Sequence, residues 1–450
     1  MSRSIVKWDL KNININKFSV IFVVSVIAAG IIILVYVFHI FSSINYPDNN
    51  IKIIHYADHI SAAHQELIDI FNEEHKGKIR VETVNLPFEK FSTNERKELL
   101  VRFFRNKNDR IDVFSVDQIW VPRFQGWGIP LDSLISDTTR DNIIKYALES
   151  CIYNNKFVAV PLYIDISLMY YRDDLLRKLK NYKEIVQKLS NSITWQDFIE
   201  LHKKFNNKKN PFYIMQAENY EGLVCQFVEM VRGLKGYLIN GNKINLNTKE
   251  ARRALQLLVD FVNKYRISPK DVLYFKEITS YKYFIKNNGV FLRSWPGFLK
   301  DYKTYINNPK IYNNLRRAPV PHFKGYNPAS VFGGWNLMIS KFSKNKKEAL
   351  EFIKFLLKAE SQKILYTDGG YIPINNKVYQ DSAFLDKNPE LKFYSRLLKT
   401  GVHRPFLENY TIISDILSHY INIAIRKELT VQEALSKAQE EINSKNILNE

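Results

Sequence analysis

Strand and helix candidates alternate along the chain from Ile51 onward. Ile51–Tyr56 is a short apolar strand candidate, and a helix with one apolar face follows from Ala63 to Phe71. Residues 79–83 form a second strand candidate, and Ile111–Val116 forms a third after another helical stretch. This βαβαβ order predicts an α/β fold with a mostly parallel sheet that helices cover on both faces. Ligands bind beyond the carboxyl ends of the strands in such sheets.

The length and the charge limit what the chain can be. Its 450 residues exceed the size at which one hydrophobic core stops growing, so we expect two lobes. The formal net charge is +19, but the lysines and arginines are scattered singly, and the densest run, 341–347, opens a predicted amphipathic helix. Dispersed lysines are typical of a solvated surface rather than of a nucleic-acid groove. We therefore expect no nucleic-acid partner.

The cysteines and histidines give no metal or redox motif. Cys151 and Cys225 are too far apart for a CxxC motif, so two free thiols and one disulfide both stay open. His55, His59 and His64 lie near Asp58 around the end of the first strand, but their spacing matches no closed zinc pattern. We expect no metal and no cofactor.

An apolar run near the N-terminus predicts a membrane anchor. Phe18–Phe41 is longer than the ~20 residues that cross a bilayer, whereas a cleaved signal has an apolar core of about 7 to 15 residues. Four basic residues precede the run, namely Arg3, Lys7, Lys11 and Lys17. No Lys or Arg occurs in residues 42–50, so the positive-inside rule places residues 1–17 in the cytoplasm. Residues 42–50 then tether a folded part that lies outside the cytoplasmic membrane.

Polar and aromatic side chains follow the predicted strands, at the ends where a ligand would bind. Asp58 and His59 follow the first strand, while Asp117 and Trp120 follow the third. Asp117 has two open interpretations, because an Asp after a strand can cap the next helical segment or accept hydrogen bonds from a ligand.

Two tryptophans are further candidates for contact with a ligand. Trp335 follows Gly333 and Gly334 at the start of a strand, where glycines allow a close approach of backbone and an indole ring can form a stacking wall. Trp295 lies in the segment RSWPGF and is a similar candidate. The alternative for both is ordinary packing, in the core for Trp335 and in a loop for Trp295.

Eight segments carry a resemblance to a known family, in the order in which that family has them. They are LIDIFNEEHKGKIRVE, RIDVFSVDQIWVPRFQGWGIPLD, VAVPLYIDISLMYYRDDLL, TWQDFIEL, NGVFLRSWPGF, FGGWNLMISKFSKNKKEALEFIKFLL, TDGGYIPINNKVY and HRPFLENYTIISDIL. In these segments the chain resembles the extracellular solute-binding proteins of the sugar type, the maltose- and trehalose-binding-like receptors of ABC importers.

The resemblance implies a two-lobed, periplasmic-binding-protein-like fold that closes on a sugar about a hinge, preceded here by one N-terminal transmembrane helix. We assign residues 51–163 and 317–341 to lobe 1, and residues 164–316 and 342–450 to lobe 2. The resemblance further implies a monomeric receptor that passes its sugar to the permease subunits of an ABC importer.

The resemblance also implies which residues contact the sugar. Carboxylates and a guanidinium would bind hydroxyl groups, and aromatic rings would stack on the apolar faces of the sugar. Together with Asp58, His59 and Trp120 at the strand ends, the candidates are Asp117, Tyr163, Asp165, Trp295, Gly334, Trp335, Tyr371 and Arg404.

Two other functions stay open beside transport. The chain has neither a GxSxG nor an HExxH motif, so we do not expect an enzyme. A membrane-anchored hydrolase with two dispersed carboxylates is nevertheless an alternative, because tertiary distance defines such a pair. A sugar sensor for a signalling partner is another. Arg293 and Arg404 also leave an anionic sugar open as the ligand.

Overall fold

The computed structural model describes residues 26, 28–34, 51–88, 90–91, 93–107, 110–205, 209–240, 243–301 and 309–445. The chain divides into two compact units, Met1–Ile51 and Lys52–Glu450. Residues 28–34 of the first unit are helical and exposed. The predicted cytoplasmic segment 1–17, the tether 42–50 and most of the predicted span 18–41 lie outside the described residues. Within the described part of the chain, no helix has both the length and the apolar character that a membrane crossing requires.

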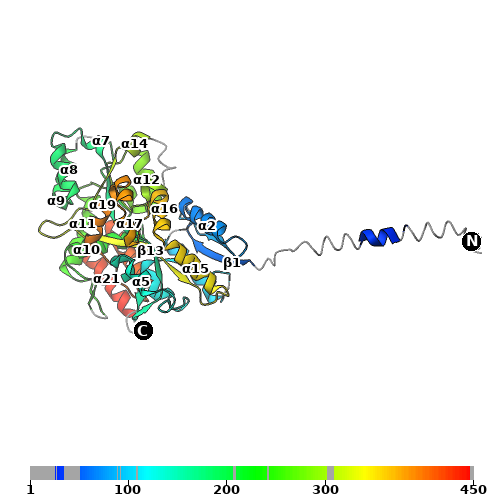
Figure 1. Ribbon diagram of the computed structural model, residues 1–450. Coiled ribbons are helices and arrows are strands. Elements are labelled where there is room, and N and C mark those ends of the chain that lie inside the picture. Colours follow the sequence, from blue (N-terminus) through cyan, green and yellow to red (C-terminus); the bar gives the residue numbers. More distant parts are fainter. Residues whose placement is uncertain are drawn as a thin grey trace, which may run out of the picture. The chain divides into compact units, whose positions relative to one another are not determined.

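A six-stranded sheet forms the centre of the first lobe of Lys52–Glu450 (Figure 1). Its strands are β1 (Lys52–Asp58), β2 (Ile79–Asn85), β3 (Val113–Asp117), β6 (Val160–Ile166), β13 (Ser330–Ile339) and β14 (Gly401–Val402). The strand order is β14-β13-β3-β1-β2, and β6 also pairs with β13. β1 is parallel to β2 and β3, which confirms the predicted βαβαβ start, and α2 (Ala62–Glu74) and α3 (Thr93–Arg105) are its helices.

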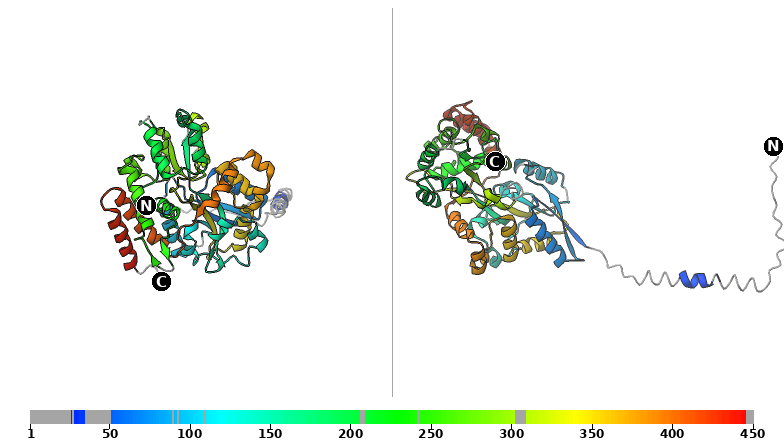
Figure 2. Two further views of the ribbon diagram at one scale, coloured as in Figure 1. Left: turned by 90° about the vertical axis from the view of Figure 1, so that its left-hand side faces the viewer. Right: turned by 90° about the horizontal axis from the view of Figure 1, so that it is seen from above.

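A four-stranded sheet forms the second lobe together with most of the remaining helices. Its strand order is β12-β7-β11-β8, with β7 (Leu168–Arg172), β8 (Tyr213–Ile214), β11 (Phe291–Ser294) and β12 (Leu315–Ala318). Four helices pack together beside it, as Figures 1 and 2 show in green and red: α10 (Glu221–Gly233), α11 (Lys249–Asn263), α20 (Tyr410–Ile425) and α21 (Val431–Ser444).

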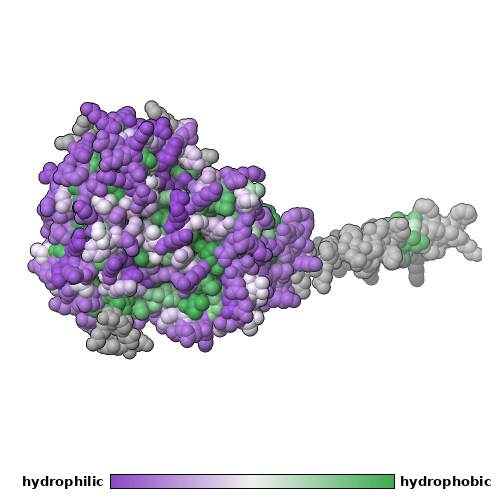
Figure 3. Space-filling view, turned by 60° about the vertical axis from the view of Figure 1, so that its left-hand side comes forward, coloured by the Kyte–Doolittle hydropathy of each residue, from purple (hydrophilic) through white to green (hydrophobic). Residues whose placement is uncertain are grey.

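The amino-acid pattern explains why these elements are buried as they are. β13 has the sequence SVFGGWNLMI and all ten of its residues are buried, as expected for a central strand with neighbours on both edges. α11 buries one apolar stripe, from Ala251 to Val262, and begins where the Thr248 side chain accepts a hydrogen bond from the Ala251 amide. Hydrophilic side chains cover most of the face shown in Figure 3, as expected for lysines that are scattered over a solvated surface.

The chain passes between the two sheets at three places. Ser167 joins β6 directly to β7, residues 319–329 join β12 to β13, and residues 403–409 join β14 to α20. The Ser167 amide donates to the Val331 carbonyl over 3.0 Å, so the first connection is bonded to the start of β13, just after the second connection. Short connections of this kind are the usual site of a hinge between lobes.

The predicted lobe assignments need correction at three places. α15 (Lys346–Leu356) and α16 (Ala359–Gly369) fall in the range that we assigned to lobe 2, but both contact α2 in the first lobe. The chain returns to the first lobe with β13, stays there through α15 and α16, and passes to α20 only at 403–409, a course that the local sequence does not encode. The predicted boundaries at 163/164 and 316/317 fall within β6 and β12, so residues 164–166 belong to the first sheet and residues 317–318 to the second.

Gly334 is the residue of β13 that cannot carry a side chain. Its φ is +127°, and an added Cβ would lie 2.6 Å from the Tyr163 carbonyl oxygen on β6. We expect Gly334→Ala to lower the free energy of unfolding by about 2 kcal/mol, measured by denaturant unfolding. Gly126→Ala is the matched control, because its added Cβ meets no described atom within 4 Å. Equal stability of the two variants would contradict the strain at Gly334.

Candidate ligand-binding site

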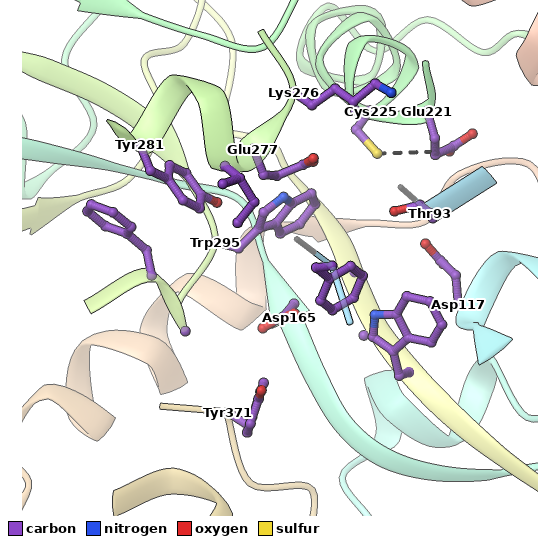
Figure 4. Close-up of a pocket in the computed structure, with 18 of the residues that line it drawn as sticks. Thr93, Asp117, Asp165, Glu221, Cys225, Lys276, Glu277, Tyr281, Trp295 and Tyr371 are labelled. Carbon is purple, nitrogen blue, oxygen red and sulfur yellow. Dashed lines mark hydrogen bonds between the residues drawn. The ribbon is translucent and has the colours of Figure 1, made fainter. Parts of the chain in front are cut away.

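A cavity of about 490 Å³ lies between the two lobes, close to the connections between them. Both lobes contribute to its wall (Figure 4). The first lobe supplies Phe88, Lys90, Thr93, Glu95, Asp117, Tyr163, Asp165, Gly333, Gly334, Trp335 and Tyr371. The second lobe supplies Glu221, Gly222, Cys225, Lys276, Glu277, Ile278, Thr279, Tyr281, Lys282, Trp295, Gly297 and Phe298, and the third connection supplies Arg404.

Strand register brings three of the predicted residues to the same level of the first sheet. Trp335 on β13 pairs with Asp117 on β3 at one edge and with Tyr163 on β6 at the other. Asp165 is opposite Gly333 in the same ladder. A carboxylate, an indole and a phenol therefore lie side by side on the cavity wall, because these strands pair in this register.

Aromatic rings form two parts of the wall. Trp335 meets Phe88 edge-on at a ring-centroid distance of 5.6 Å, and the rings of Tyr163 and Tyr371 stack at 4.3 Å. Trp295 comes from the second lobe and covers Gly333, where an added Cβ would lie 2.9 Å from its Cζ3 atom. Gly333 thus makes room for a tryptophan from the opposite lobe.

Arg404 joins the two lobes through two carboxylates. Its Nη2 donates to Asp117 Oδ1 in the first lobe and its Nη1 donates to Glu221 Oε1 in the second, each over 2.6 Å. Tyr410 and Ser414 also donate to the Glu221 carboxylate. All three charged side chains are buried, so the hydrogen bonds replace water around them.

Burial and charge act in opposite directions on these groups. Burial raises the pKa of Glu221; Arg404 lowers it, nearby Asp117 raises it further, and the net change is upward. Burial alone would lower the pKa of Arg404, but Asp117 and Glu221 outweigh it and hold the pKa above the usual range. Arg404 therefore stays positively charged and is the counter-charge of both carboxylates.

Eight of the eleven candidates from the sequence line the cavity. They are Asp117, Tyr163, Asp165, Trp295, Gly334, Trp335, Tyr371 and Arg404. The structure also gives Asp117 its capping role, since the Ile119 amide donates to its carboxylate over 3.1 Å. Contact of these residues with a ligand stays a prediction.

The other three candidates, Asp58, His59 and Trp120, are buried and lie outside the lining of the cavity, and their contact with a ligand stays a prediction. Asp58 forms an ion pair with Arg96, whose Nη2 is 2.8 Å from its Oδ1. The His59 ring packs on Phe88, and burial lowers the pKa of His59 to about 3, so it is neutral at ordinary pH. Trp120 is buried edge-on against Trp335. Phe88 and Arg96 cover this strand end, and neither was visible as a neighbour of β1 in the sequence.

Three carboxylates of the wall, Glu95, Glu221 and Glu277, were missed in the sequence. They stand in the first turns of α3, α10 and α12 (Glu277–Lys286), where an acidic residue is ordinarily explained by the helix dipole. Burial raises the pKa of Glu277, which lies beside Trp295 in Figure 4. An acidic first turn directly after a loop was the available signal. It does not distinguish a carboxylate that stabilises the helix dipole from one that lines a ligand cavity.

The described residues give no sign of a metal centre. No group of three His, Cys, Asp or Glu side chains among them is arranged to hold a metal ion. Cys151 and Cys225 are both free and buried, so the structure decides for two thiols. Cys225 lies at the cavity, where its thiol donates to Glu221 over 3.9 Å.

The bridge made by Arg404 can be tested through stability. We expect Arg404→Met to lower the free energy of unfolding by about 3 to 5 kcal/mol at pH 7, because it leaves two buried carboxylates without a counter-charge. Arg426→Met is the control, since that guanidinium bonds to the neutral partners Asn422 and Tyr274.

The stability that Arg404→Met loses should become smaller as the pH is lowered from 7 toward 4.5, the ordinary pKa of Glu. Without Arg404 the pKa of Glu221 in the folded state rises further, and a carboxyl with a raised pKa stabilises the fold only at low pH. Unfolding curves across this range measure the effect, and a loss that stays constant with pH would contradict the ionic role of Arg404.

Comparison with known proteins agrees with this arrangement. The family described as bacterial extracellular solute-binding protein matches residues 66–392. A probable ABC transporter-binding protein of Deinococcus radiodurans is 27% identical over 332 residues, which cover 72% of this chain and 77% of the relative.

Solved structures share the fold. Maltose-bound MalE3 of T. maritima is 27% identical with a TM-score of 0.78, over 87% of this chain and 99% of that one. The GacH receptor of Streptomyces glaucescens, solved without ligand and with acarbose, is 20% identical with a TM-score of 0.75, over 89% of this chain and 99% of that one. The chain belongs to the family of bacterial extracellular solute-binding proteins.

Proposed function

We propose that the chain is an extracytoplasmic receptor that captures a neutral sugar or oligosaccharide between its lobes and delivers it to the permease of an ABC importer. The observation that carries the proposal is the cavity, in which aromatic rings and carboxylates from both lobes converge. The maltose in MalE3 and the transporter association in the name of the Deinococcus relative support it.

The chemistry of the wall suits a carbohydrate. The apolar faces of a sugar ring stack on Trp335 and Trp295, while its hydroxyl groups donate to carboxylates such as Asp117. Because the two tryptophans belong to different lobes, closure about the hinge would place the sugar between them. A cavity of about 490 Å³ is within the range of small-molecule sites.

The arginines near the cavity argue for a neutral ligand. Arg404 already donates to two carboxylates, and Arg293 is fully buried with Glu229 3.5 Å away. Neither guanidinium is therefore available to neutralise a uronate or a phosphate ester. Asp117 and Glu221 are bonded to the same guanidinium, which also disfavours them as the acid and base of a hydrolase.

We also propose that residues 18–41 anchor the receptor in the membrane and that it works as a monomer. The support for the anchor is the apolar run with basic residues before it, and residues 42–50 would keep the lobes near a permease.

Ligand capture can be measured with a panel of neutral and anionic oligosaccharides. We expect a neutral sugar to raise the unfolding temperature of the full-length chain and to be recovered intact. Trp335→Ala should weaken binding of that sugar at least about tenfold, the loss of one stacking contact. Trp127→Ala is the control, because Trp127 belongs to the first lobe and packs against Phe124. Turnover of a glycoside, or preference for an anionic sugar, would overturn the proposal.

The anchor has a separate test. Cells that express the chain should retain it in the membrane fraction after a high-salt wash, and N-terminal sequencing should find the residues before Phe18. Cleavage within residues 29–43 and release from the membrane would remove the anchor from the proposal.

A further inference from the structure

Two fully buried arginines lie against the tryptophans of the cleft, one in each lobe. The Arg96 guanidinium lies over the Trp335 ring, 3.9 Å from its centroid, and the side chain is 1% exposed. The Arg293 guanidinium lies 5.2 Å from the centroid of Trp295, and that side chain is 0% exposed. Both arginines lie behind the rings, outside the described lining of the cavity.

Each arginine has one buried carboxylate as its counter-charge. Arg96 Nη2 is 2.8 Å from Asp58 Oδ1, and Arg293 Nη2 is 3.5 Å from Glu229 Oε2. Asp58 also accepts from the Tyr56 hydroxyl and from the His59 amide. The charges therefore balance within each pair, and neither pair draws on the carboxylates of the cavity.

Stability alone does not explain these pairs. A buried ion pair often stabilises a fold no more than well-packed apolar residues of similar volume would. The planar guanidinium, in contrast, stacks on aromatic rings in a way that a lysine or an alkyl chain does not. Arg96 also lies 4.5 Å from the Phe88 centroid, so its guanidinium contacts two aromatic rings of this wall.

In the second lobe the pair reaches the hinge. The Glu229 carboxylate accepts from the Val331 amide over 3.2 Å and from the Ser167 hydroxyl. Ser167 is the first connection between the lobes, and Val331 is near the start of β13, directly after the second. Arg293 thus links the ring of Trp295 to the two connections about which the lobes would move.

We propose that Asp58–Arg96 and Glu229–Arg293 are positioning pairs for ligand capture. Each pair fixes the plane of one cleft tryptophan and occupies one of its faces, so that the other face is presented to the ligand. This inference rests on the proposed function, in which a sugar stacks on Trp335 and Trp295. Asp58, which does not line the cavity, thereby acts on the ligand through Arg96.

The test replaces both charges of a pair at once. Arg96→Met alone would leave Asp58 unpaired and endanger folding, whereas the double variant Asp58→Asn/Arg96→Met leaves a neutral pair of similar volume. Asp112→Asn is the matched control, because Asp112 is a buried carboxylate of the same lobe that accepts from the His55 amide and the Ser343 hydroxyl. Glu229→Gln/Arg293→Met is the equivalent variant of the second lobe.

We expect each double variant to bind the sugar about fivefold to twentyfold more weakly than the parent, measured by titration calorimetry on the full-length chain. Asp112→Asn should bind like the parent, and the unfolding temperatures of all three variants should be similar. Unchanged affinity in a folded Asp58→Asn/Arg96→Met variant would overturn the inference for the first lobe, and unchanged affinity in the other double variant would overturn it for the second.

A ligand-free measurement separates this inference from the proposed function. Loss of the Arg96 charge should change the near-ultraviolet circular dichroism of the tryptophans, and the change should vanish when Trp335→Phe is present in both proteins. The same holds for Arg293 with Trp295→Phe. If the parent binds no sugar of the panel, the proposed function fails. The spectra still test the positioning role, because an unchanged Trp335 signal would overturn it.

Discussion

The pairing of β13 with a neighbour on each edge is the interaction on which the rest of the structure depends. β3 pairs with residues 335–339 and β6 with residues 332–337, while the first residues of β13 follow the connection from the second lobe. The strand that carries Trp335 to the cavity is therefore also part of the hinge region. Gly334, with its positive φ, lets the β6 backbone approach closely enough for this ladder to form. A change at the hinge must reach the ligand wall, because no flexible loop separates them.

Charges around the cleft follow a common rule. Arg96, Arg293 and Arg404 are all buried, and each has one or two carboxylates within ion-pair distance. The formal charge of +19 therefore says little about the ligand, since the arginines nearest the cavity are neutralised by the protein itself. These compensated arginines therefore give no reason of their own to expect an anionic ligand.

The sequence predicted what local patterns encode. The βαβαβ start follows from the alternation of apolar runs, and Asp117 was found because it follows a strand of that sheet. Trp335 was found from the glycines before it, and Tyr163 only from the family resemblance. Asp58 satisfies the same rule as Asp117, yet its carboxylate pairs with Arg96, which lies on the helix α3, 38 residues further along the chain. Strand-end position does not reveal which side chain will cover that end.

Other features depended on contacts that no local pattern contains. Glu221 reaches the cavity because α20, far along the chain, packs against α10 and brings Tyr410 and Ser414 to its carboxylate. The return of α15 and α16 to the first lobe is likewise a property of chain order between the lobes. Helical periodicity identified such segments as amphipathic but carried no information on the lobe that each one covers.

The Arg404 bridge also constrains how the lobes can separate. Arg404 belongs to the third connection and bonds to Asp117 in one lobe and to Glu221 in the other. Separation must lengthen at least one of these bonds, which exposes a carboxylate that burial had kept from water. Water then has to replace the guanidinium, so opening and hydration of the cleft occur together. A sugar hydroxyl that donates to the same carboxylate offers a third partner, and this is a physical reason why capture and closure in such a cleft are linked.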